Sequence, residues 1–335
     1  MESFSFDRAA LAGARAAQDL DDPPAMVPAA LAPPGDLRTE VSLADLVSFL
    51  ENPARGFLRD RLGIALPREA DELGERIPLD LDALERWQVG DRVLRARRAG
   101  ATGEDAYRAE LLRGELPPGE LGTTALREVQ QVVEGVVRDL DRFTGGSPAA
   151  SVDVTVDLLD GLRLTGTVDG VHAGNIVDAT YSRVGARHEI GAWARLLALV
   201  AASGRDEAHQ AAVLGKGRGA ILGPLPAEAA RAHLSTLAQV RAVGQQIPVL
   251  VPVKTGRAWA EAAGDGRRTR AARNAAGGEW AGRFPESEDR WWTRLLGAAA
   301  PLERLTQTGP GDLDGSLPTQ APAIWRPVLA NRRTP

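Results

Sequence analysis

Two aspartates, Asp169 and Asp178, are the residues of this sequence whose placement could support chemistry. Asp169 falls near the end of one predicted strand and Asp178 falls within the next, so their carboxylates can meet on neighbouring strands. Two such carboxylates can hold a hard divalent cation through oxygen ligands. A cation held there can activate a bound water as a nucleophile. The alternative is that both residues are ordinary polar side chains at a strand end and a turn.

The strands that position these aspartates come from an alternating segment. Apolar and polar residues alternate from Val152 to Leu158 and again from Leu162 to Asp169, with Asp160-Gly161 as a tight hairpin turn between them. A third strand is predicted from Asn175 to Tyr181. An apolar helical pattern follows over residues 190–200, which predicts a sheet with a helix packed on it.

This arrangement resembles the site of the PD-(D/E)XK nuclease fold, in which a carboxylate on one strand is followed by an Asp-x-Lys on the next. Residues i and i+2 of a strand share a face, so the lysine can stabilise charge on the attacking water or the phosphate. Thr180 stands here in place of that lysine. The resemblance implies an α/β fold with a nuclease-like mixed sheet flanked by helices. It also implies a vestigial site at Asp169, Asp178 and Thr180 that has no basic companion.

A displaced base is the alternative to a vestigial site. Lys216, Arg183 or His188 could swing towards the aspartates and complete an active magnesium-dependent nuclease. The segment Gly215-Lys216-Gly217 is more typical of a solvated strand end, and it lacks the spacing of a phosphate-binding P-loop. The four histidines have no ligand-like spacing and cysteine is absent, so we expect no metal site and no cofactor.

The composition indicates a packed cytoplasmic protein. The chain has 335 residues, of which 44% are hydrophobic and 25% charged, enough for one large or two ordinary domains. It contains no apolar run of 18 residues and no secretory signal pattern, so we expect no membrane contact. The net charge of −5 argues against a protein that binds polyanions over its whole surface, but it is compatible with a local basic groove.

We predict three parts along the chain. Residues 1–40, rich in Ala, Asp and Pro, form an extended arm or linker. Residues 41–146 form a helical portion, with Ser42 and Asn52-Pro53 as helix starts. Residues 147–335 form the nuclease-like core with C-terminal helices and a tail. Within this core, Pro248 to Pro252 reads as a short edge strand, and the tail around Trp325 is expected to dock back on the body.

An arginine cluster is the best local basic patch of the sequence. It comprises Arg267, Arg268, Arg270 and Arg273. Surface solvation explains such a run as readily as a phosphate contact does. If the cluster touches DNA, it should position the backbone and carry no sequence information.

The order and spacing of several motifs resemble the C-terminal domain of RecC, the gamma subunit of exodeoxyribonuclease V (RecBCD). These motifs are Ser3 to Asp7, Val41 to Leu46, Asn52 to Leu58, Leu81 to Gln88, Gly114 to Gly119, Leu164 to Gly166, Pro248 to Leu250 and Trp325 to Pro327. The resemblance implies a nuclease fold without an active site, in contact with RecB-like and RecD-like subunits. It also implies a part in splitting the duplex at a double-stranded DNA end or fork.

These observations predict a non-catalytic, structural and DNA-handling domain of a helicase-nuclease complex for double-strand break repair. Two alternatives remain open. One is an active nuclease with a relocated lysine, and the other is a protein-interaction scaffold that makes no DNA contact.

Overall fold

The computed structural model describes residues 9, 11, 13, 15, 29–34, 40–66, 80–204, 208–264, 269–309 and 312–335, apart from the side chains of Asp160 and Arg218. Most of the predicted arm, including the motif from Ser3 to Asp7, lies outside these ranges. None of the helices within them is both long and apolar enough to cross a membrane.

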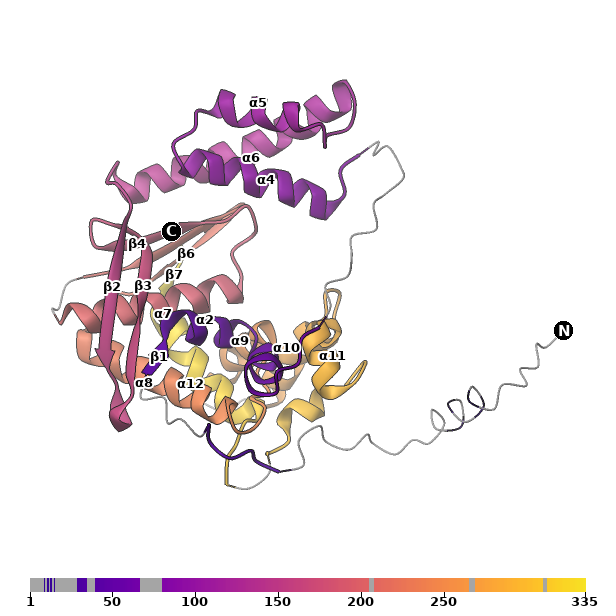
Figure 1. Cartoon of the computed structure of the whole chain (residues 1–335), viewed down its shortest axis with the longest axis vertical. Helices are drawn as coiled ribbons and strands as arrows, with labels where there is room; N and C mark the ends of the chain where they lie inside the picture. The colour runs from indigo at the N-terminus through magenta and orange to yellow at the C-terminus, as the bar shows by residue number, and fades with distance from the viewer. Residues whose placement is uncertain are drawn as a thin grey trace.

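A mixed seven-stranded sheet lies at the centre of the fold (Figure 1). Its strands run in the order β1-β3-β4-β5-β6-β7, and β2 pairs with β3 beside this path. The β1/β3 and β4/β5 pairs are parallel, and the other pairs are antiparallel. The strands are β1 (Glu40–Ser42), β2 (Ala150–Asp157), β3 (Arg163–His172), β4 (Asn175–Ala179), β5 (Ala211–Gly215), β6 (Arg218–Leu222) and β7 (Arg332–Arg333). This sheet, with helices on both faces, confirms the predicted mixed α/β class.

The alternating segment forms β2, β3 and β4, as the sequence predicts. Leu158 N donates to Leu162 O across the first turn at 2.7 Å, and Gly161 there has a φ of +73°, a conformation that favours glycine. The second turn, at Ala173-Gly174, has φ values of +46° and +86°. Two consecutive residues with positive φ match the twist of antiparallel strands, so β4 returns directly beside β3.

Helix α7 (Ala186–Ser203) covers one face of the sheet. Its side chains of Trp193, Leu196 and Leu197 are fully buried, which confirms the helix predicted over residues 190–200. The other helices of this layer are α2 (Leu43–Glu51), α3 (Pro53–Arg55), α8 (Ala227–Gly244), α9 (Val253–Ala263), α10 (Thr269–Ala281), α11 (Arg290–Leu296) and α12 (Leu317–Ala330).

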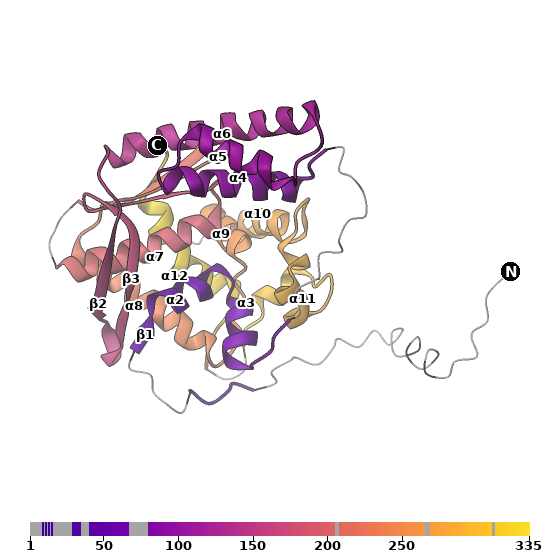
Figure 2. The same cartoon turned by 45° about the horizontal axis from the view of Figure 1, so that its top comes forward.

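Within the described residues, three helices cover the opposite face (Figure 2). They are α4 (Ala83–Arg98), α5 (Gly103–Arg113) and α6 (Glu120–Thr144). The apolar stripe of α6, which includes Val129 and Val133, is buried against the sheet. The helices shield sheet residues such as Val177 and Leu214 from solvent. Helices α2 and α3, although they also belong to residues 41–146, pack on the other face with α7. The predicted boundary between a helical portion and a nuclease-like core at residue 146 stays a prediction.

The segment from Pro248 to Pro252 is not a strand, so that prediction is wrong. Its two prolines have no backbone N–H to donate to a sheet, and Leu250 N donates instead to Gly315 O at 2.7 Å. The predicted docking of the C-terminal segment is confirmed, because Trp325 of α12 is 1% exposed.

The packing of α4 on the sheet can be tested with Gly90→Ala. A Cβ at Gly90 would collide with the ring of Tyr181, so we expect the free energy of unfolding to fall by about 1–3 kcal/mol, as overpacking does. Gly135→Ala in α6 is the matched control, because nothing lies within 4 Å of a Cβ there. It should raise the free energy of unfolding by about 0.5–1 kcal/mol through helix propensity. Urea denaturation measures both, and equal effects would contradict this packing.

Candidate functional site

The two predicted aspartates line one cavity at the junction of β3 and β4. These strands pair at Val171 with Ile176 and at His172 with Asn175. Beside this short ladder lies a cavity of about 250 Å³, lined by Arg98, Thr167, Asp169, Gly170, Ile176, Val177, Asp178 and Arg195. The structure therefore brings Asp169 and Asp178 to one place, as the strand pattern predicts.

Two arginines hold the carboxylate of Asp178. Arg98 Nη1 lies 3.1 Å from Oδ1, and Arg195 Nη1 lies 3.8 Å from Oδ2. Arg98 Nη1 also donates to Ala179 O at 3.3 Å. Arg98 is the last residue of α4 and Arg195 lies within α7. Asp178 thus connects helices from the two opposite faces of the sheet.

The prediction that the aspartates have no basic companion is wrong for Asp178. Arg98 is 80 residues away from Asp178 in the chain, and no local spacing points to it. Arg195 carried a weak signal, because it is the one charged residue in the apolar stretch from Ile190 to Val200. A guanidinium stays charged at any physiological pH. It therefore cannot act as a base, and it competes with a divalent cation for the Asp178 carboxylate.

Asp169 and Thr180 take part in local hydrogen bonds. Asp169 is exposed and accepts a hydrogen bond from Ser151 Oγ at 2.6 Å. Thr180 follows β4, where its N–H donates to Leu214 O at 2.9 Å and its Oγ1 accepts from Ser182 N at 3.2 Å. Thr180 is not among the described residues that line the cavity. Its hydroxyl therefore shapes the turn after β4.

The candidate displaced bases lie elsewhere. Lys216 Nζ lies 5.8 Å from the centroid of the Tyr181 ring, while Arg183 and His188 line a different cavity. Burial lowers the pKa of His188, against an opposing effect of Asp178. Across the described ranges, no group of three or more His, Cys, Asp or Glu side chains could hold a metal ion.

The predicted arginine cluster is described in part. Arg267 and Arg268 lie outside the described residues. Arg270 and Arg273 are both exposed in the first turns of α10. Their spacing of three places them on one face of the helix.

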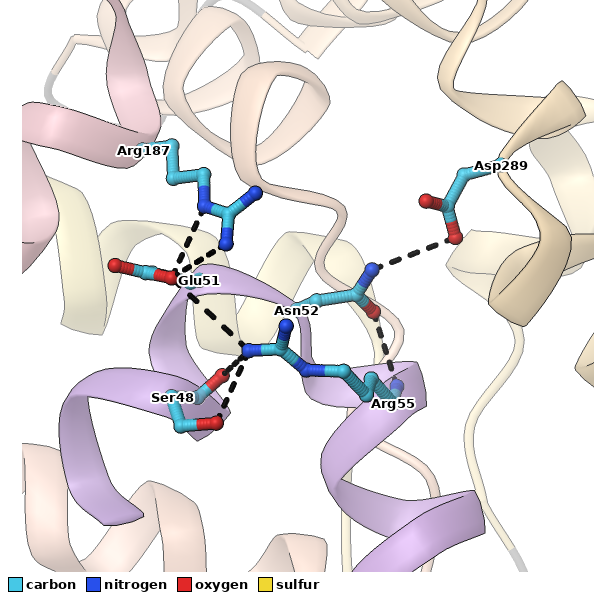
Figure 3. Close-up of polar contacts among 6 residues, drawn as sticks. All are labelled: Ser48, Glu51, Asn52, Arg55, Arg187 and Asp289. Atoms are coloured by element: carbon cyan, nitrogen blue, oxygen red, sulfur yellow. Dashed lines mark hydrogen bonds and ion pairs between the residues drawn. The ribbon is translucent and has the colours of Figure 1, made fainter. Parts of the chain in front are cut away.

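A second polar network joins α2 and α3 to α7 and α11 (Figure 3). Asn52 Oδ1 accepts from Arg55 N at 3.0 Å, which confirms the predicted helix start, and Asn52 Nδ2 lies 3.4 Å from Asp289 Oδ1. Glu51 Oε2 lies 2.9 Å from Arg187 Nη2. Asp289 is 237 positions away from Asn52 in the chain. The Asn52-Pro53 helix start therefore also connects two distant parts of the chain.

Comparison with known proteins decides the family. A sequence model described as the RecC C-terminal domain matches residues 38–264, which is more than half of the chain. The chain belongs to the RecC C-terminal domain family. The match includes the Asp178 cavity and ends shortly after α9, so α10 to α12 of this chain lie beyond it.

The chain is similar to relatives named RecBCD enzyme subunit RecC. The protein from Mycobacterium tuberculosis strain H37Rv is 38% identical over 98% of this chain and 30% of its own length. The protein from Mycolicibacterium smegmatis is 37% identical over 78% of this chain and 24% of its own length. The Escherichia coli K12 protein is 26% identical over 68% of this chain and 20% of its own length. This chain therefore spans less than a third of the curated relatives that it matches.

Asp178→Ala tests whether the carboxylate acts as an anchor. We expect it to lower the free energy of unfolding by on the order of 1 kcal/mol, because two guanidinium groups are left without their carboxylate. Asp157→Ala is the matched control, because the Asp157 side chain that pairs with Arg163 is 76% exposed, whereas the Asp178 side chain is 42% exposed. This control should lower the free energy of unfolding by less than Asp178→Ala does. Thermal unfolding measures both. A gain in stability at Asp178, as expected when repulsion between clustered acids is relieved, would contradict the anchor.

Proposed function

We propose that this domain is a non-catalytic, structural and DNA-handling part of a cytoplasmic helicase-nuclease complex for double-strand break repair. In this proposal its partners are RecB-like and RecD-like subunits and a double-stranded DNA end or fork. Its roles are subunit contact and duplex splitting. Membership of the RecC C-terminal domain family supports the proposed place in such a complex.

The contact of Arg98 and Arg195 with Asp178 carries the non-catalytic part of the proposal. In a PD-(D/E)XK site this carboxylate would bind a divalent cation, and a lysine two residues later would stabilise charge. Here two fixed positive charges lie at the carboxylate, and Thr180 hydrogen-bonds within its own turn. We infer that the fold derives from such a nuclease and that Asp178 has become an internal anchor.

The isolated domain should not cleave DNA. With magnesium and linear plasmid we expect no loss of substrate above a reaction that contains EDTA, because Arg98 and Arg195 already hold the Asp178 carboxylate that would bind the cation with Asp169. Thr180→Lys should stay inactive for the same reason. Gel analysis of both proteins measures this. Cleavage by the wild-type chain that disappears on Asp178→Ala would overturn the proposal in favour of an active nuclease.

The arginine cluster should contact phosphates without reading sequence. Changing Arg267, Arg268, Arg270 and Arg273 to Gln should weaken binding of the assembled complex to forked DNA. The slope of log affinity against log salt should fall by roughly 0.9 for each phosphate that the variant no longer neutralises. The matched control changes four exposed arginines of the opposite layer, Arg108, Arg127, Arg138 and Arg142. Equal salt slopes for the two variants would favour a scaffold that makes no DNA contact through α10.

A further inference from the structure

A cavity of about 680 Å³ lies where the start of α7, the start of α9 and the α10–α11 connection meet. It is separate from the Asp178 cavity, and the network of Figure 3 forms part of its wall. Its lining includes four carboxylates and four arginine or lysine side chains. Which of these charges are already engaged decides what the cavity can bind.

Three of the four carboxylates are engaged by neighbouring groups. Glu51 is paired with Arg187. Asp289 accepts from Trp291 N at 2.9 Å and so caps α11. Glu286 accepts from Lys254 N at 3.0 Å, Thr255 N at 2.7 Å and Thr255 Oγ1 at 2.9 Å. Burial raises the pKa of Glu286 against the opposing effect of these three bonds.

The exposed groups of the cavity are mostly cationic. Arg183 and Lys254 are exposed, and their side chains have no hydrogen-bond or ion-pair partner within the described part of the chain. The Arg283 guanidinium lies 5.4 Å from the centroid of the Phe284 ring, and Phe284 is 73% exposed. Glu288 is the remaining exposed acid of the lining. Among the described residues, the mouth therefore carries Arg183 and Lys254 as unpaired cations, Arg283 beside the largely exposed ring of Phe284, and Glu288 as an available acid.

We propose that this cavity binds a nucleotide unit, with its phosphate against Arg183, Lys254 and Arg283 and its base on the ring of Phe284. Charge-assisted hydrogen bonds from arginine and lysine are the strong ones for phosphate. An exposed aromatic ring stacks an unpaired base of any identity. The unit can come from a single strand or from a free nucleotide, and the former rests on the DNA-handling role proposed above. An unpaired base is required, because a base within a duplex cannot cover the ring.

The test measures binding of fluorescein-labelled dT12 by anisotropy and of ATP by calorimetry, with the whole chain. Changing Arg183, Lys254 and Arg283 to Gln should raise the Kd of the bound probe tenfold or more. With dT12 the salt slope should also fall by roughly 0.7 for each phosphate that the triple variant no longer neutralises. The matched control changes Arg108, Arg127 and Arg138 to Gln and should leave the Kd unchanged. Circular dichroism verifies that both variants fold.

Two single variants separate this site from general charge attraction. Phe284→Ala should weaken dT12 more than a blunt duplex of equal length, whereas Leu112→Ala, another exposed apolar residue, should affect neither. Glu288→Gln should tighten binding, because it removes the acid that opposes a phosphate. An effect on both dT12 and ATP would identify the nucleotide unit itself, and an effect on dT12 alone would identify a strand.

The cavity proposal is overturned if neither probe binds the wild-type chain. It is also overturned if binding survives the triple variant and disappears instead when Arg267, Arg268, Arg270 and Arg273 are changed. In that second case the proposed DNA-handling function would stand while the cavity proposal fails. Failure of the cavity proposal can therefore be told from failure of the proposed function.

Discussion

A carboxylate held by two guanidinium groups joins the two layers of this fold. Arg98 enters from α4 on one face of the sheet and Arg195 from α7 on the other, and both meet Asp178 on β4. Partly exposed ion pairs contribute modestly to stability, so this contact mainly fixes the positions of α4 and α7 relative to β4. The apolar packing of α7 and α6 against the sheet supplies the larger driving force.

The same contact determines what chemistry the site can perform. A divalent cation needs oxygen ligands whose charge is not already neutralised, and Asp178 offers its carboxylate to arginines instead. A guanidinium cannot release a proton in the physiological range. A single substitution to lysine at Thr180 would therefore not rebuild the site while both arginines remain in place.

Acidic residues elsewhere in the molecule are also engaged in structure. Asp289 caps α11 and contacts Asn52, while Glu286 accepts bonds from the start of α9. Glu189 of α7 is fully buried between Arg257 and Arg332. Because these acids are bound internally, a chain with a net charge of −5 can still expose local cationic surface at α10 and at the α7–α9 cavity.

The sequence by itself determined the elements and much of the topology. Alternation from Val152 to Asp169 specified a hairpin because side chains of a strand point to alternate faces, and the apolar pattern over residues 190–200 specified helix α7. The strand predicted at Pro248 to Pro252 failed because β-propensity cannot replace a missing backbone N–H.

Tertiary structure alone decided which charges far apart in the chain meet. The strand pattern predicts that Asp169 and Asp178 lie close together, because it places them on neighbouring strands, and both line one cavity. The contact of Arg98 with Asp178 has no signal in the sequence, since a helix end can approach any strand that the packing allows. In the same way, the local sequence predicts Asn52 as a helix start, whereas its contact with Asp289 depends on how α3 and α11 pack. Local pattern therefore determines the elements, and long-range packing determines the partners of their charged side chains.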